Sequence, residues 1–136
     1  MIIDIHGHYT TYPPGVEAYR GAQIAQMGAP TKGKMKVSDD EIRHSIETGQ
    51  LKVQRERGTD LTLFSPRASW MGHHFGGELI SRYWIEHTND LVYRVQQMFP
   101  DNFVGVCQLP QSPGVPIDGC VVELEQIGRA SCRERV

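Results

Sequence analysis

A chain of 136 residues, of which 22% are charged and 39% hydrophobic, has the size and composition of one globular domain. Its 14 basic and 16 acidic side chains leave a net charge of −2, which excludes a basic field that would attract nucleic acid or an anionic membrane. No apolar run approaches the roughly 18 residues of a membrane span, and no secretory signal pattern opens the chain. We therefore expect a cytoplasmic protein with no nucleic-acid or membrane partner.

The first half of the chain predicts two strands separated by helical segments. Within residues 1–8 the β-branched Ile2, Ile3 and Ile5 predict a short buried strand that ends at two histidines. Residues 9–37 are rich in Gly and Pro, which predicts a long excursion with at most one short helix at 17–27. A capping box at Ser38 starts a helix that we expect to run to residue 57, and residues 61–64 form a second buried strand.

The second half continues the same alternation. Residues 78–99 predict the most regular helix, with one apolar stripe formed by Leu79, Tyr83, His87, Leu91, Val95 and Met98. Residues 103–109 predict a third strand and residues 116–127 a last helix, whose inward side chains we expect to be Val121, Val122 and Leu124. Alternating strands and helices predict an α/β class with a parallel sheet.

The last nine residues, 128–136, differ from the rest of the chain. The string GRASCRERV contains three arginines and no core periodicity. It is similar to a translated read-through of a cloning adapter, although a genuine disordered terminus has the same composition. We expect residues 1–127 to be the native portion and residues 128–136 a non-native tail.

The polar side chains that follow the predicted strands are the candidates for chemistry, because sites assemble at the carboxyl ends of parallel strands. His6 and His8 are two residues apart on a strand, so both side chains and that of Asp4 should share one face. Two neutral imidazoles suit Zn, Fe, Mn or Ni, and Asp4 could orient one of them. The alternative is a pair of hydrogen-bonded histidines at a strand end. Three cysteines without a CxxC spacing indicate reduced thiols.

Four stretches carry a resemblance to a known family: MIIDIHGHYTT, ERGTDLTLFSPRASWMGHH, SRYWIEHTNDLVYRV and QLPQSPGV. The chain to about residue 127 resembles the N-terminal part of amidohydrolase-related proteins, and SPRASWMGHH narrows the similarity to the hydratases among them. The resemblance implies a (β/α)8 barrel whose first-strand histidines, here His6 and His8, bind a divalent metal, and zinc is the metal that we expect. It also implies addition of water to 4-oxalomesaconate, an unsaturated oxo tricarboxylate formed in bacterial breakdown of protocatechuate and gallate.

A complete barrel needs about 250 residues, so the resemblance implies a fragment of that fold. The family's other ligands and catalytic residues come from later strands, and we expect no hydration by this chain alone. A polycarboxylate substrate calls for bidentate donors, so Arg67, helped by Ser65, is the candidate clamp. His73 or His74 could contact substrate or transfer a proton, or neither has a role.

Two alternatives to the hydratase stay open. The same metal-binding strand could serve an amidohydrolase-related decarboxylase or hydrolase, because fold alone does not decide the reaction. A non-catalytic small α/β module that binds a metal or a partner is the other alternative. In each case, open sheet edges favour self-association or a homo-oligomer.

Overall fold

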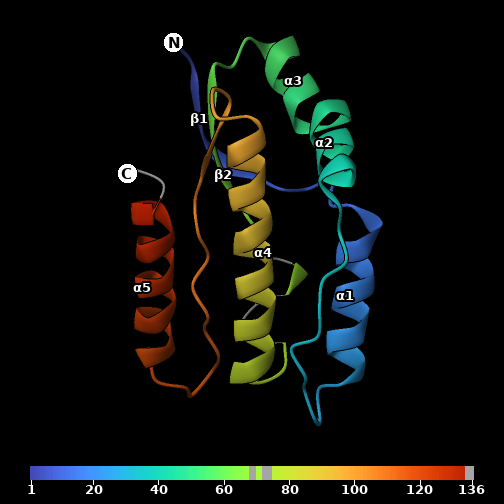
Figure 1. The fold of residues 1–136 in the computed structure, drawn as a ribbon, viewed down its shortest axis with the longest axis vertical. Coiled ribbons are helices and arrows are strands. Elements are labelled where there is room, and N and C mark those ends of the chain that lie inside the picture. Colours follow the sequence, from blue (N-terminus) through green and yellow to red (C-terminus); the bar gives the residue numbers. More distant parts are fainter. Residues whose placement is uncertain (68–69, 72–74, 134–136) are drawn as a thin grey trace.

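The computed structural model of the protein describes residues 1–67, 70–71 and 75–133, with side chains as far as Ile127. Its elements, in chain order, are β1 (Ile3–His8), α1 (Pro14–Ala25), α2 (Asp39–Thr48), α3 (Gln50–Arg57), β2 (Leu61–Ser65), α4 (Glu78–Met98), β3 (Phe103–Gly105) and α5 (Asp118–Arg133). Within these residues the strands form a parallel sheet in the order β1-β2-β3. Figure 1 shows α4 at the centre, with α1, α2 and α3 on one side and α5 on the other. The predicted α/β class is confirmed.

The helix expected over residues 38–57 is interrupted at Gly49. Its start is as predicted, because Ser38 Oγ accepts the Glu41 N–H at 3.2 Å and the Glu41 carboxylate accepts the Ser38 N–H at 2.8 Å. At Gly49 the backbone leaves helical geometry, and a Cβ there would lie 2.8 Å from Thr11 Oγ1. The carbonyl oxygen of Ser45, 2.7 Å from the same position, and Thr11 together leave no room for a side chain, so this position requires glycine. The chain continues beyond it as α3.

One face of the sheet packs on the helices. Thr62, Phe64 and Phe103 alternate onto this face and are buried, and Trp84 of α4 is fully buried in the same cluster. The predicted stripe of α4 is right for Leu91 and Val95 but wrong for Leu79, which is 38% exposed. Because α4 is central and contacts neighbours on several sides, its burial covers a wider arc, which includes Ile80, Trp84, Ile85, Thr88 and Val92.

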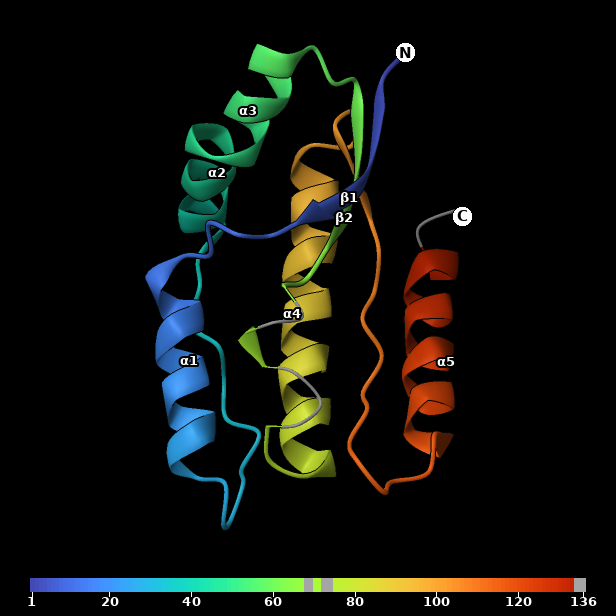
Figure 2. The same cartoon turned by 180° about the vertical axis from the view of Figure 1, so that it is seen from behind.

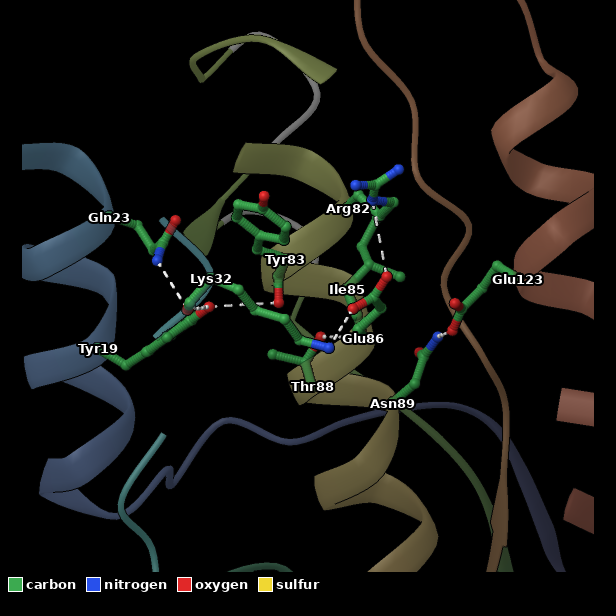
Figure 3. Close-up of polar contacts among 10 residues, drawn as sticks. All are labelled: Tyr19, Gln23, Lys32, Arg82, Tyr83, Ile85, Glu86, Thr88, Asn89 and Glu123. Atoms are coloured by element: carbon green, nitrogen blue, oxygen red, sulfur yellow. Dashed lines mark hydrogen bonds and ion pairs between the residues drawn. The ribbon is translucent and has the colours of Figure 1, made fainter. Parts of the chain in front are cut away.

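The chain after β3 is attached to α4 by polar side chains. Asn89 donates to Gln108 O and accepts the Gln108 N–H, both at 2.9 Å, and also donates to Glu123 Oε1 at 2.9 Å. Ser81 makes a similar pair of hydrogen bonds with the backbone of Gln111. Figure 3 shows the Asn89–Glu123 contact reaching from α4 to α5. The strand β3 ends at Gly105 and is shorter than the predicted 103–109. The backbone of Gln108 pairs with the Asn89 side chain and not with a strand.

Helix α5 turns a different face inward from the one predicted. Cys120 and Glu123 are buried, whereas Val121, Val122 and Leu124 are 53–55% exposed. The Glu123 carboxylate is held by Asn89, and the Cys120 thiol donates to Pro110 O at 2.9 Å. Polar contacts therefore set the rotation of this helix, and the expected apolar face is wrong. The helix also continues to Arg133, past the predicted end at residue 127.

The second face of the sheet is uncovered by the described residues. Ile3, Val104 and Val106 are 46%, 39% and 42% exposed, and Figure 2 shows β1 and β2 in front of α4 from this side. Among the helices of the described residues, none combines the length and apolar character that a membrane span needs. Apolar side chains of the sheet are thus buried on one face and open on the other.

Candidate functional site

The end of β1 contains an irregularity that sets the direction of its side chains. Asp4 pairs with Thr62 and His8 pairs with Ser65, and the register shifts between Asp4 and Gly7. Thr62 and Ser65 are three residues apart on a regular strand, so they point to opposite faces. Asp4 therefore lies on the helix-covered face and His8 on the uncovered one. The prediction that Asp4 shares the face of His8 is wrong, because an extra β1 residue interrupts the alternation.

The structure brings the two predicted histidines together. The ring centroids of His6 and His8 are 4.7 Å apart and the rings are nearly perpendicular, with an interplanar angle of 88°. His6 is exposed and His8 is half-buried. Instead of orienting an imidazole, the Asp4 carboxylate accepts the backbone N–H of His6 at 3.0 Å. This contact holds the irregular segment of β1 in shape.

Ser65, the neighbour of His8 on β2, contacts its imidazole directly. Ser65 Oγ lies 2.7 Å from His8 Nδ1 and donates to the carbonyl oxygen of Gly7 at 3.1 Å. A backbone hydrogen bond joins the same two strands beside this contact, because the Tyr9 N–H donates to Ser65 O at 2.9 Å. Sequence reasoning identified Ser65 as a substrate contact and missed its bond to His8. This bond could have been predicted, because His8 and Ser65 end two strands that pair in parallel and so lie side by side.

Gly7, between the two histidines, is required by a close approach of β2. A Cβ at this position would lie 2.2 Å from Thr62 Cγ2 and 2.8 Å from the carbonyl oxygen of Leu63. Both distances are shorter than real Cβ contacts allow, and the carbonyl belongs to the backbone of the neighbouring strand. The His-Gly-His spacing therefore reflects packing of β1 on β2 as well as the placement of two imidazoles.

A cavity of about 600 Å³ borders the histidine pair along the open edge of β1. Its walls come from β1 and the segment after it, from α3 and the turn before α3, and from Thr62, Phe64 and Phe103 of β2 and β3. Here the amide of Gln50 lies 2.6 Å from Thr11 Oγ1 and 2.7 Å from Thr10 Oγ1. Hydroxyl and amide groups thus line the side of the cavity opposite the sheet.

The remaining predicted residues are more scattered. Arg67 is half-buried, with its guanidinium 5.5 Å from the centroid of the Trp70 ring, and its backbone N–H donates to Tyr12 Oη at 3.0 Å. His73 and His74 lie outside the described residues. Gln108 and Gln111, which also follow a strand, are held by their backbones to α4.

Two further histidines were expected to have structural positions. His44 is exposed, as predicted. His87 packs edge-on against the Tyr19 ring at 4.7 Å, and burial followed by the nearby Lys32 lowers its pKa. Its Nε2 is buried without a hydrogen-bond partner in the described part of the chain, so the expectation of a fully satisfied packing residue is only half right.

The donor chemistry of the His6–His8 pair fits a transition-metal ion. Two imidazoles this close are suitable ligands for Zn²⁺ and similar ions. A protein zinc site uses at least three side chains, and no group of three His, Cys, Asp or Glu suited to a metal occurs among the described residues. The described residues therefore offer two imidazoles at this position and no third ligand beside them.

A solved amidohydrolase II structure has the same fold as this chain. It superposes with a TM-score of 0.57 at 18% identity, over 93% of this chain and 36% of that chain, and so shares the fold. No family model matches the sequence. The predicted fold, an α/β segment similar to part of an amidohydrolase, is confirmed.

Two hydratases are much more similar. The 2-keto-4-carboxy-3-hexenedioate hydratase of Sphingobium sp. (strain NBRC 103272 / SYK-6) is 45% identical over 128 residues, which are 93% of this chain and 38% of that protein. The crystal structure of 4-oxalomesaconate hydratase, LigJ, from Rhodopseudomonas palustris is 48% identical with a TM-score of 0.85, over 96% of this chain and 40% of that chain. The chain thus spans about 40% of the length of these relatives. The predicted resemblance to amidohydrolase-related hydratases is confirmed.

Proposed function

We propose that residues 1–127 form the first part of a metal-dependent hydratase barrel that adds water to 4-oxalomesaconate or a closely related unsaturated oxo tricarboxylate. The observation that carries the proposal is the His6–His8 pair at the end of β1, in a chain 45–48% identical to two proteins named as hydratases. Both relatives' names describe an oxo acid with three carboxyl groups and one carbon–carbon double bond. Later strands of the barrel would complete the site.

In this proposal His6 and His8 hold a divalent ion, most suitably Zn²⁺. When bound, such an ion supplies Lewis acidity and makes water more acidic. Arg67 follows the strand that carries Ser65, and its planar guanidinium suits bidentate binding of a substrate carboxylate. Ser65 is already bonded to His8 and Gly7, so any help it gives the clamp requires those bonds to open. His73 or His74 stays the proposed group for substrate contact or proton transfer.

The alternatives receive less support. A decarboxylase or hydrolase could use the same metal strand, but both similar proteins are named as hydratases. A non-catalytic module would explain the small sheet, yet it gives no reason for a chain so similar to part of two longer enzymes. Hydration of an oxo tricarboxylate is therefore the function that the site supports best.

A chimera tests this proposal. Residues 1–127 replace the matched segment of the Sphingobium hydratase, and hydration of 4-oxalomesaconate is followed in the presence of Zn²⁺. We expect turnover by the chimera and none by the 136-residue chain alone. A folded, metal-loaded chimera without hydratase activity would reject the function.

We also propose that the chain by itself self-associates through its open sheet. The outer edges of β1 and β3 have no neighbouring strand in the described residues, and Val104 is 39% exposed on the uncovered face. Sedimentation velocity should show dimers or larger species. Val104→Lys should shift them toward monomer, whereas Val121→Lys on the exposed side of α5 should not. A monomer at every concentration would contradict the proposal.

A further inference from the structure

We infer that Ser65 is a positioning residue that fixes His8 in the tautomer with hydrogen on Nδ1 and so leaves Nε2 to bind the ion. The inference rests on the proposed function, because it gives the His8 ring the role of a metal ligand. Ser65 is thereby given the role of orienting a metal ligand, His8, whereas the sequence led us to expect Ser65 in contact with substrate.

A serine hydroxyl has one hydrogen to donate. The Gly7 carbonyl oxygen, 3.1 Å from Ser65 Oγ, can only accept, so a hydrogen bond at this contact takes the hydroxyl hydrogen. For the 2.7 Å contact between Ser65 Oγ and His8 Nδ1 to be a hydrogen bond as well, its hydrogen comes from the imidazole. Satisfying both contacts thus places the hydrogen of the neutral ring on His8 Nδ1 and leaves a lone pair on Nε2.

The surroundings keep this arrangement rigid. His8 and Ser65 are direct partners in the parallel pairing of β1 and β2, so their side chains leave the sheet on the same face. The Tyr9 N–H, bonded to Ser65 O at 2.9 Å, fixes the two backbones beside the contact. The ring of His6 lies edge-on beside that of His8, with the two centroids 4.7 Å apart.

This arrangement matches a general property of metal-binding histidines. A ligating imidazole usually donates its second N–H to a nearby acceptor, which sets its tautomer and orientation, and loss of that acceptor weakens metal binding by about 10–100-fold. At this site the acceptor is a hydroxyl. Asp4 supplies no such contact, since its carboxylate binds the His6 backbone from the other face.

The test uses the whole metal-free chain with isotope-labelled histidine. At about pH 8.5, where an ordinary imidazole is neutral, ring ¹⁵N spectra report which nitrogen carries hydrogen. We expect His8 to be protonated on Nδ1 in the parent chain and in Ser65→Thr, which keeps the hydroxyl. Ser65→Ala should move His8 toward the tautomer mixture of free imidazole. A His8 protonated on Nε2 in the parent, or an unchanged spectrum in Ser65→Ala, would overturn the inference.

A Zn²⁺ titration of the same three chains separates this inference from the proposed function. We expect weak binding by the parent and by Ser65→Thr, and binding about 10–100-fold weaker for Ser65→Ala. If the tautomer changes as expected while the parent binds no Zn²⁺ at any concentration, the proposed metal site fails and the hydrogen-bond assignment stands. If Zn²⁺ binds equally to all three chains, the positioning role is rejected and the metal site is retained.

Discussion

Gly7→Ala is expected to destabilise the chain by about 1–3 kcal/mol or more, because it inserts a methyl group into a filled space. The new Cβ would lie 2.2 Å from Thr62 Cγ2 and 2.8 Å from the Leu63 carbonyl oxygen. A threonine side chain can rotate, but the Leu63 carbonyl belongs to the backbone of β2 and moves only with the strand. Urea unfolding followed by circular dichroism measures the loss.

Two variants make this prediction specific. Gly7→Ala combined with Thr62→Ser removes the Cγ2 clash and should recover part of the stability, with the carbonyl contact retained. Gly21→Ala, in helix α1, adds a methyl group where no heavy atom lies within 4 Å and should be neutral or slightly stabilising. Equal stability of Gly7→Ala and the parent would show that β1 and β2 pair less closely than the structure indicates.

Features with a local chemical cause were predictable from the sequence. The capping box depends on Ser38 and Glu41 alone, and both of its hydrogen bonds are present. Gly58 ends α3 with a φ of +66°, a left-handed conformation that glycine adopts without strain. The alternation of strands and helices predicts a parallel sheet, because a helix between two strands returns the chain to the same end of the sheet. Fold class and the position of the histidine pair therefore follow from short-range patterns.

Features decided by a distant partner were not predictable in this way. The need for glycine at position 49 comes partly from Thr11, which is 38 positions earlier in the chain and lies where a Cβ would be, beside the local carbonyl oxygen of Ser45. The face of α5 is set by Asn89, which holds the buried carboxylate of Glu123 and overrides the apolar pattern of Val121 and Leu124. An amphipathic pattern identifies a helix but does not show which neighbour supplies its contacts.

The site shows the same division between local and long-range causes. His6 and His8 were identified because an alternating strand places them together, and the rings do approach. Asp4 was assigned to the same group by the same alternation, which fails at the register shift between Asp4 and Gly7. A bulge leaves no clear mark in one sequence, so the partner of His8 was found only in the structure, as Ser65.

In the chimera with the Sphingobium hydratase, His6→Ala and His8→Ala are each expected to abolish tight binding of a divalent ion and to lower turnover by more than about 100-fold. Removal of one imidazole from a site with three protein ligands leaves an under-coordinated ion. The effect should therefore exceed the 10–100-fold loss typical of a residue that only orients a ligand. Metal content of the purified protein and hydration of 4-oxalomesaconate are the two measurements.

His44→Ala is the matched control, because His44 is exposed on α2 and should leave both measurements unchanged. A full metal content in both His6→Ala and His8→Ala would remove the pair from the metal site. Loss of metal in His8→Ala alone would assign the exposed His6 to another role. Because the rings are 4.7 Å apart and His8 is held by Ser65, we expect the two variants to lose the ion together.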